Sequence, residues 1–472
     1  MVFSSTEFIW FFLPIVIALY FVCYALEKKT NHIKNLLLLI SSLIFYAWGE
    51  PLYIFLMLAS IAFNYGMGLW NGKKHSKWLL ALAVVGNLGC LGLFKYLHFF
   101  LSNVGLLLHT QRFDQYQLAL PIGISFYTFQ ALSYVIDVYK GTIKPQKNPL
   151  NLALYIAFFP QLIAGPIVKY RDIETQLENR KVTLDSFSLG VRRFLYGLGK
   201  KVIISNTLAE IVDTIYGQNL QTISTPVAWL GAICYLFQIY YDFSGYSDMA
   251  IGLGKIFGFD FPENFNFPYL ADSIKDFWRR WHISLSSWFK EYLYIPLGGN
   301  RKGNVRTYIN LIIVFFCTGL WHGANWTFVV WGLFHGVFQL LEKGPFGRWL
   351  NNKAPRVVAH IYALLVVTVG WVFFRADTLT DAITYLGRMF GFTFGQGFIP
   401  AGYLNGYNIV VLILAVLLCG LWQKLLPRIY GVHVCNAKEI SIWDILLCIL
   451  IALWAGTMIV CGTYNPFIYF QF

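Results

Sequence analysis

Charged side chains are scarce in this chain. Only 12% of its 472 residues are Asp, Glu, Lys or Arg, whereas soluble domains carry about 25%. Hydrophobic residues make up 57% of the chain, and the mean hydropathy is +0.56. This composition excludes an ordinary soluble protein and indicates a polytopic membrane protein that contacts the lipid bilayer.

The signatures of several enzyme classes are also missing. The sequence contains no GxSxG, no P-loop GxxxxGK[ST], no HExxH and no GxGxxG before a strand, which argues against the hydrolases, NTPases, metalloproteases and dinucleotide-binding enzymes that carry them. Its 8 cysteines form no CxxC motif and no Cys/His pair at metal-ligand spacing. We therefore expect neither a metal centre nor a bound cofactor.

The basic residues predict how the chain crosses the membrane. The net charge is +13, but no basic stripe lies on a soluble face, so we expect no nucleic-acid binding. Loops 101–117 and 215–226 hold only Arg112 between them. Lys and Arg gather instead in the alternate loops, which are 28–34, 71–77, 140–148, 169–201 and 342–356. Because basic loops stay on the cytoplasmic side, we expect the N-terminus to lie outside.

Apolar segments that approach the roughly 20 residues of a bilayer-crossing helix are candidate spans. They are 8–26, 35–48, 51–70, 78–100, 118–139, 227–254, 358–374, 407–423 and 443–463. Segment 190–216 is interrupted by charges. Segment 149–168 is interrupted by Pro160 and Pro166, and segment 307–341 is broken near Gly319–Ala324. Basic loops flank both 149–168 and 307–341. We therefore expect 149–168 to be a re-entrant segment or a short hairpin and 307–341 to be a broken hairpin. The whole chain would then make about ten or eleven crossings.

Ionisable residues inside apolar segments are costly and are therefore functional candidates. His322 lies at the break of the second hairpin, where small neighbours permit close approach of backbone or ligand. Its imidazole titrates near neutral pH and can serve as a general base. The alternative is a structural histidine that bonds a neighbouring carbonyl and fixes the helix break. We interpret His335, in the next helix, as a packing residue.

The segment 276–288 combines aromatic residues with adjacent basic ones. Its large apolar residues recur at helical spacing and are Trp278, Trp281, Leu285 and Trp288. This pattern predicts an amphipathic helix at the cytoplasmic interface. Arg279 and Arg280 are either lipid anchors or contacts to an anionic donor. His282 is the part of this segment that an anchor does not require.

Two carboxylates, Asp242 and Asp248, lie inside the apolar segment 227–254. They could bind a cation, relay protons or orient a histidine. The alternative is pairing with an arginine or capping of a helix break around Gly245. Six residues apart, they are not aligned on one helix face, so they do not form an acid–base pair.

With these residues identified, the chain resembles the membrane-bound O-acyltransferase family, most closely its branch of bacterial alginate O-acetyltransferase membrane subunits. The matching blocks are LPIGISFYTFQALSYVIDVYKG (120–141), FFPQLIAGPI (158–167), YYDFSGYSDMAIGLGKIFGFDFPENFN (240–266), DFWRRWHISLSSWFKEYLYIPLGGNRKG (276–303), GLWHGANWTFVVWG (319–332) and GWVFFRA (370–376). The resemblance is best over residues 1–400, and the blocks around His282 and His322 are its most specific parts.

The resemblance implies an all-α polytopic fold, a ring of membrane helices around a central tunnel, with residues 1–472 as a single domain. It implies transfer of an acyl group, most simply acetyl, from a cytoplasmic thioester such as acetyl-CoA to an extracytoplasmic polysaccharide such as alginate. His322 would deprotonate the acceptor hydroxyl, and His282 would orient or polarise the thioester or the acceptor. Asn325 and Asp242 are further candidates for positioning.

The resemblance also implies a setting for this reaction. The protein would lie in the inner (plasma) membrane of a bacterium, beside a separate extracytoplasmic acetyltransferase of the SGNH hydrolase type. Two alternatives remain open. D-alanyl transfer to teichoic acid from a carrier-protein thioester would use the same machinery. A proton-coupled transporter would explain broken helices and buried acids, although the inverted repeats of many transporters are not evident.

The expected topology can be tested by labelling single cysteines with a reagent that cannot cross the membrane. A cysteine at position 74 should be protected in intact cells, because its loop is basic and cytoplasmic. A cysteine at position 105 should be labelled. Strong labelling at 74 together with protection at 105 would invert the topology.

Overall fold

The fold is helical throughout the part of the chain that is described. The computed structural model describes residues 1–27, 30–110, 112–113, 115–116, 118–392, 402–421, 441–462 and 464–468, and every regular element in these ranges is a helix. The all-α prediction is therefore confirmed. A helix satisfies its own backbone hydrogen bonds, as an apolar environment requires. Lys28, Lys29 and Cys435 lie outside the described residues.

Seven of the described helices are long and apolar enough to cross a membrane. They are Phe8–Leu26, His32–Gly49, Tyr53–Lys74, Lys77–Leu107, Asn304–His322, Arg356–Arg375 and Ile442–Cys461, with two shorter apolar helices at Trp326–Leu341 and Gly406–Leu421. The multi-pass prediction is confirmed. The count of ten or eleven crossings and the ring around a central tunnel stay predictions, as does the single domain.

Three expected spans are not among these seven. Of these, 407–423 corresponds to the shorter apolar helix Gly406–Leu421. Segment 118–139 becomes helical only at Ile124, because Gly123 has a left-handed backbone (φ 76°), and the helix has 16 residues. Segment 227–254 lies within a helix of 32 residues, which carries Asp242 and Asp248 among its apolar side chains. The expected loop 101–117 is also partly helical, since the fourth span continues to Leu107.

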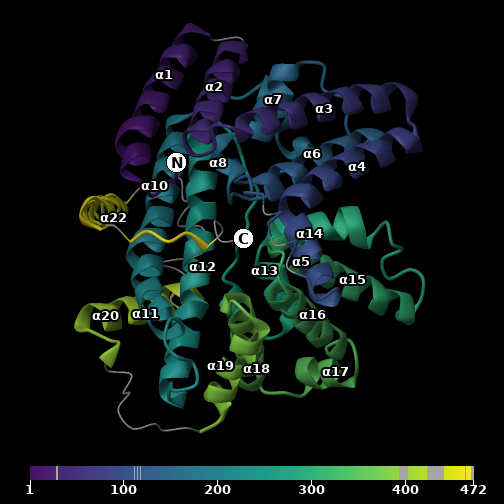
Figure 1. The fold of residues 1–472 in the computed structure, drawn as a ribbon. Helices are drawn as coiled ribbons and strands as arrows, with labels where there is room; N and C mark the ends of the chain where they lie inside the picture. Colours follow the sequence, from purple (N-terminus) through teal and green to yellow (C-terminus); the bar gives the residue numbers. More distant parts are fainter. Residues whose placement is uncertain are drawn as a thin grey trace. The chain divides into compact units, whose positions relative to one another are not determined.

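The chain separates into two compact units. The first comprises Met1–Phe194 and Ser247–Pro262. Its helices in chain order are η1 (Phe8–Phe12), α1 (Leu13–Leu26), α2 (His32–Gly49), α3 (Tyr53–Lys74), α4 (Lys77–Leu91), η2 (Gly92–Tyr96), α5 (Leu97–Leu107), α6 (Ile124–Tyr139), α7 (Pro149–Ala157), α8 (Phe159–Leu162) and α9 (Tyr170–Glu178). Here α6 packs against both α3 and α4, and α2 packs against α1 and α7 (Figure 1).

The second unit comprises Leu195–Tyr246 and Glu263–Phe472, and two helices contribute to both units. The shared helices are α10 (Leu184–Gly199) and α12 (Thr225–Ile256). The other helices of the second unit are η3 (Lys200–Ser205), α11 (Asn206–Tyr216), η4 (Pro268–Leu270), α13 (Ile274–Arg280), α14 (Ile283–Phe289), η5 (Lys290–Tyr294), α15 (Asn304–His322), α16 (Trp326–Leu341), α17 (Pro345–Asn352), α18 (Arg356–Arg375), α19 (Leu379–Phe390), α20 (Gly406–Val416), η7 (Leu417–Leu421) and α22 (Ile442–Cys461).

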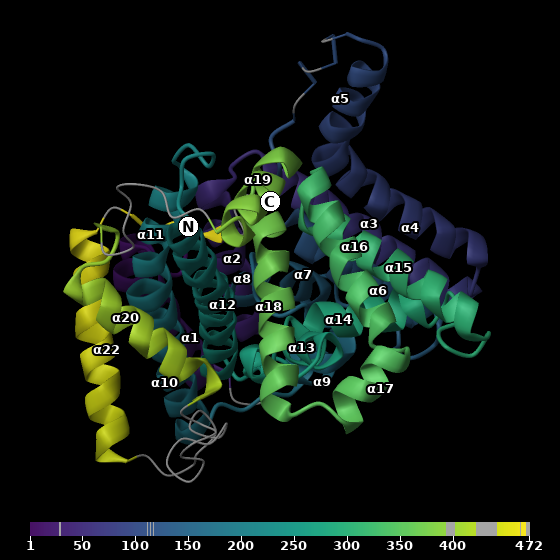
Figure 2. The same ribbon diagram turned by 90° about the horizontal axis from the view of Figure 1, so that it is seen from below.

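The predicted breaks in two segments are present. In segment 149–168, α7 ends at Ala157, the short α8 follows, and no helix continues to Val168. In segment 307–341, α15 and α16 form a hairpin interrupted between His322 and Trp326, and the two helices run side by side (Figure 2). Their close approach needs glycine, because a Cβ at Gly332 would lie 2.3 Å from the carbonyl oxygen of Phe315.

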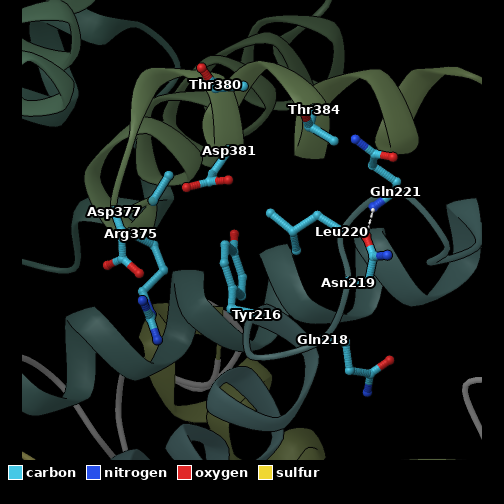
Figure 3. Close-up of a pocket in the computed structure, with 11 residues that line it drawn as sticks. Tyr216, Gln218, Asn219, Leu220, Gln221, Arg375, Asp377, Thr380, Asp381 and Thr384 are labelled. Atoms are coloured by element: carbon cyan, nitrogen blue, oxygen red, sulfur yellow. Dashed lines mark hydrogen bonds between the residues drawn. The ribbon is translucent and has the colours of Figure 1, made fainter.

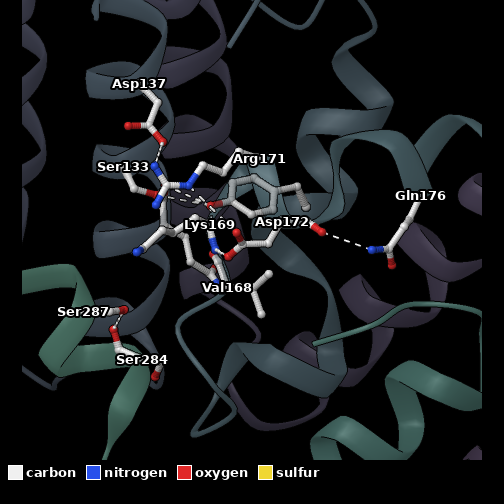
Figure 4. Close-up of polar contacts among 11 residues, drawn as sticks. Ser133, Asp137, Val168, Lys169, Arg171, Asp172, Gln176, Ser284 and Ser287 are labelled. Atoms are coloured by element: carbon white, nitrogen blue, oxygen red, sulfur yellow. Dashed lines mark hydrogen bonds and ion pairs between the residues drawn. The ribbon is translucent and has the colours of Figure 1, made fainter. Parts of the chain in front are cut away.

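The expected basic loop 169–201 is not a loop, and several of its charges serve the packing. Residues 170–178 and 184–199 are helical. Arg171 lies 3.9 Å from both Asp137 and Asp172, and Asp172 also accepts the backbone N–H of Lys169, which starts α9 (Figure 4). Arg193 donates to Asp248 through Nε and Nη2, at 3.1 and 2.9 Å. The expectation of a basic loop over residues 169–201 was therefore wrong.

Arg180 is buried and connects several elements of the first unit. Its Nε donates to the Tyr20 hydroxyl and to the carbonyl oxygen of Phe257, both at 3.1 Å. Its Nη1 donates to Oδ1 of Asn35 at 2.6 Å, and its guanidinium lies 4.5 Å from the centre of the Phe259 ring. A charge in this position is tolerated because its Nε and Nη1 donate to partners on α1, α2 and the segment after α12.

We predict that Arg180→Met destabilises the protein strongly. Each buried acceptor left without a donor costs about 1–3 kcal/mol. Thermal unfolding in detergent should show a clear fall in melting temperature. Lys181→Met is the matched control, because Lys181 is exposed, and its melting temperature should match that of the wild type. An equal effect of the two changes would contradict a structural role for Arg180.

Candidate functional site

The structure brings the two predicted catalytic histidines together inside the second unit. His282 precedes α14 and His322 is the last residue of α15. Their ring centres are 6.3 Å apart, and both residues are buried, with 0% and 3% of their surface exposed. Two residues that are distant in the sequence thus share one interior site.

The single amphipathic helix predicted around His282 is wrong. Helix α13 ends at Arg280 and α14 begins at Ile283, because His282 has a left-handed backbone with φ 44° and ψ 55°. Such a conformation is rare for a residue with a Cβ and is found at sites that hold strain for function. The large apolar residues of this segment do not face lipid but are buried, namely Trp278, Trp281, Leu285 and Trp288.

A short stretch of backbone pairing holds His282 in this conformation. The N–H of Asn266 donates to the carbonyl oxygen of Arg280, and the N–H of Ile283 donates to that of Asn264, both at 2.9 Å. The two bonds flank His282 and place segment 264–266 against it. Asn264, which the sequence-based prediction missed, thereby lies next to the imidazole.

The side chain of Asn264 contacts His282 directly. Its Oδ1 lies 3.1 Å from Nδ1 of His282, and Asn264 is fully buried. His282 lies outside the candidate spans, and burial lowers the pKa of its imidazole to about 3. The ring is therefore neutral near pH 7, as a proton acceptor must be.

Aromatic rings surround His322. Its ring centre lies 5.0 Å from that of Trp331 on α16 and 5.3 Å from that of Phe374 on α18. Helix α15 ends at His322, and the packing leaves no room for a side chain on the next residue, because a Cβ at Gly323 would meet the Phe328 ring at 2.3 Å. These contacts shield the histidine pair from bulk water.

The two arginines beside His282 differ in their surroundings. Arg280 donates to Asp276 at 2.8 Å and to the carbonyl oxygen of Asn266 at 3.2 Å, so its guanidinium is occupied within the protein. Arg279 is exposed. Of the two, Arg279 is therefore the better candidate for contact with an anionic donor or with lipid headgroups.

Glu342 supports the helix that leads to His282. Its carboxylate accepts the backbone N–H groups of Ile274 and Lys275 at the start of α13 and the hydroxyl of Tyr362 at 3.2 Å. Burial raises the pKa of this carboxyl, against the opposing effect of these hydrogen bonds. The sequence-based prediction missed this residue because its partners on α13 lie far earlier in the chain.

Asp242 is engaged in an ion pair, which favours the structural alternative considered for it. It pairs with Lys201 on η3, and the two side chains are each 1% exposed. The pair also holds the end of the described chain, because Asp242 accepts the N–H of Ile468 at 3.0 Å and Lys201 donates to the carbonyl oxygen of Pro466.

Asn325 and His335 also have structural roles. The Oδ1 of Asn325 accepts the N–H of Thr327 and caps α16, and its Nδ2 donates to the carbonyl oxygen of Asp377 at 2.9 Å. His335 is fully buried and packs between aromatic rings, including Trp278 at 5.4 Å. The packing interpretation of His335 agrees with this placement.

A polar cavity of about 330 Å³ lies in the second unit (Figure 3). Its walls come from the α11–α12 connection and from the start of α19. Arg375 forms one side and is held there by Asp213 at 2.8 Å. The other lining residues are Tyr216, Gln218, Asn219, Leu220, Gln221, Ala376, Asp377, Thr380, Asp381 and Thr384. Since this lining includes no histidine, the cavity is distinct from the histidine pair.

Among the described residues there is also no group of three or more His, Cys, Asp or Glu that could hold a metal ion.

The chain is similar in sequence to known proteins. A sequence profile of the membrane-bound O-acyltransferase family matches residues 146–376, which include both histidines. A Pseudomonas putida protein named "Probable alginate O-acetylase AlgI" is 40% identical over 100% of both chains. A Helicobacter pylori peptidoglycan O-acetyltransferase is 39% identical over 83% of this chain and 80% of its own. A Bacillus subtilis teichoic acid D-alanyltransferase is 30% identical over 54% of this chain and 68% of its own.

A double substitution distinguishes a structural role of Asp242, in its ion pair, from a role in substrate binding. Lys201→Met leaves a buried carboxylate without its partner, which costs about 3–5 kcal/mol, so the yield of folded protein and its melting temperature should fall. Replacing both residues, with Lys201→Met and Asp242→Leu, should restore much of this stability. If the folded double variant retains its activity, Asp242 is structural. Loss of activity at full stability would show that Asp242 acts on the substrate.

Proposed function

Because the chain belongs to the membrane-bound O-acyltransferase family and is an O-acyltransferase, we propose that it O-acetylates an extracytoplasmic polysaccharide such as alginate. The acetyl group would come from a cytoplasmic thioester such as acetyl-CoA and would pass across the membrane. The observation that carries the proposal is the buried pair of His282 and His322, whose ring centres are 6.3 Å apart.

The chemistry of the reaction explains why such a pair is useful. Attack of a hydroxyl on a thioester requires removal of the hydroxyl proton and later protonation of the departing thiolate. Imidazole can carry out both transfers. A site enclosed by tryptophan and phenylalanine rings also keeps water away from the thioester. His282 and His322 are therefore the residues that we propose to be catalytic.

The setting of the reaction is part of the proposal. Loops with few basic residues, at 101–117 and 215–226, support an N-terminus outside the cell, in the inner membrane of a bacterium. The described residues form helical units and include no separate domain that would hold a polymer. We therefore propose a separate extracytoplasmic acetyltransferase of the SGNH type as the partner, and no bound cofactor.

D-alanyl transfer to teichoic acid is the second candidate function. It is supported by the similarity to a Bacillus subtilis teichoic acid D-alanyltransferase, but that similarity covers only 54% of this chain. The similarity to the Pseudomonas putida protein covers 100%. Purified protein supplied with labelled acetyl-CoA or with a D-alanyl carrier protein, together with a polysaccharide acceptor, distinguishes the two donors.

We predict that His322→Gln abolishes transfer without preventing folding. Glutamine keeps a hydrogen-bonding side chain but cannot exchange a proton, and loss of such a group typically costs about 10²–10⁴-fold in rate. The measurement is acetyl transfer per folded molecule, with folding checked by gel filtration in detergent.

His335→Gln is the matched control for this change, because His335 is equally buried but packs among rings away from the reacting groups. Its transfer rate per folded molecule should stay near that of the wild type. Near-normal transfer by the His322 variant would leave His322 with only a role in the helix break.

A further inference from the structure

The hydrogen bonds around Asn264 identify which atom of its amide faces His282. One terminal atom of this amide is close to three groups. These are the backbone N of Ser284 at 3.3 Å, the Ser284 hydroxyl at 2.8 Å and Nδ1 of His282 at 3.1 Å. A backbone N–H can only donate a hydrogen bond, so the atom that it faces must be the carbonyl oxygen Oδ1.

The identity of that atom determines the tautomer of His282. An amide oxygen can only accept, so Nδ1 of His282 must carry the hydrogen that joins them. The Ser284 hydroxyl lies 3.5 Å from Nδ1, but its shorter contact of 2.8 Å is to Asn264 Oδ1. In a neutral imidazole with a hydrogen on Nδ1, the lone pair of the ring is on Nε2.

The environment leaves that lone pair available. Nε2 of His282 is buried and has no hydrogen-bond partner among the described residues. The ring centre of His322 lies 6.3 Å away, which is longer than the roughly 5 Å expected for two imidazoles that share one N–H···N bond. Nε2 of His282 is therefore not bonded to His322.

We propose that Asn264 is a positioning residue that fixes the Nδ1–H tautomer of His282, so that Nε2 accepts the proton of the acceptor hydroxyl. This inference rests on the proposed acyl transfer and changes the roles within the histidine pair. The sequence-based prediction assigned the base to His322 and a polarising role to His282. Polarising a thioester carbonyl requires an N–H at Nε2, which this tautomer lacks.

The proposed step balances with a thioester donor. The acceptor oxygen forms a bond to the acyl carbon while its proton moves to Nε2 of His282. The bond between the acyl carbon and sulfur then breaks, and the proton passes from Nε2 by way of His322 to the departing thiolate. Asn264 continues to accept the hydrogen on Nδ1 throughout, which stabilises the transient imidazolium and keeps the ring in place.

The position of Asn264 makes it suited to this role. Its own carbonyl oxygen accepts the N–H of Ile283 at 2.9 Å, so both its backbone and its side chain are fixed beside His282. The strained φ of 44° at His282 is held by the same contacts. In the sequence, Asn264 is one polar residue of the run PENFN at 262–266, and nothing there indicates its partner.

The test combines turnover with a direct observation of the tautomer. Asn264→Leu removes the acceptor, whereas Asn264→Asp keeps an oxygen facing Nδ1. We expect the Leu variant to lose about 10²–10⁴-fold in kcat with little change in KM for acetyl-CoA. The Asp variant should recover a large part of that loss. Nitrogen-15 NMR of histidine-labelled protein in lipid, with His282→Gln as the assignment standard, should show a hydrogen on Nδ1 of His282 in the wild type and in the Asp variant.

Asn310→Leu is the control for removing a buried asparagine. Asn310 is fully buried and donates to the carbonyl oxygens of Leu297 and Gly299, away from the histidines. Its variant should keep kcat per folded molecule and the His282 signal. A hydrogen on Nε2 of wild-type His282, or near-normal kcat per folded molecule in the Asn264→Leu variant, would overturn the proposal. If the wild type transfers nothing from acetyl-CoA, the proposed function fails, whereas the NMR result still decides the tautomer.

Discussion

Polar groups inside this protein have to find partners within the chain, because an apolar interior offers no water to replace them. In the described structure several buried polar side chains each contact more than one partner. Arg180 joins three elements of the first unit. Lys201 and Asp242 join η3 and α12 and receive the end of the described chain. Asn264 accepts from His282 and Ser284.

The same requirement explains which parts of the fold could be predicted from the sequence. Long apolar runs must form self-satisfied helices, so most spans and both helix breaks were predicted correctly. The partners of buried charges could not be predicted, because Lys201 lies far before Asp242 in the chain and on another helix. Lys201 and Arg180 were expected to be charges of the basic loop 169–201, but both are buried and have partners elsewhere in the fold. Composition does not reveal such a tertiary partner.

The site around His282 shows a second limit of sequence patterns. Tryptophans at helical spacing predicted one continuous helix, but the backbone breaks at His282 with φ 44°. Periodicity records only which side chains are buried, and here both short helices bury their large apolar residues. The break depends on hydrogen bonds from segment 264–266, which is distant in sequence. The candidate histidines were therefore predictable, but the group that orients one of them was not.

The histidine pair and the polar cavity share one stretch of wall. Phe374 packs on His322, and the next three residues, Arg375, Ala376 and Asp377, line the cavity. After the hairpin break, Asn325 donates to the carbonyl oxygen of Asp377. A segment that packs over a buried histidine and also forms the wall of a polar cavity cannot move for one without affecting the other. Any acceptor that reaches His322 past the end of α18 must therefore displace contacts that shape both sites.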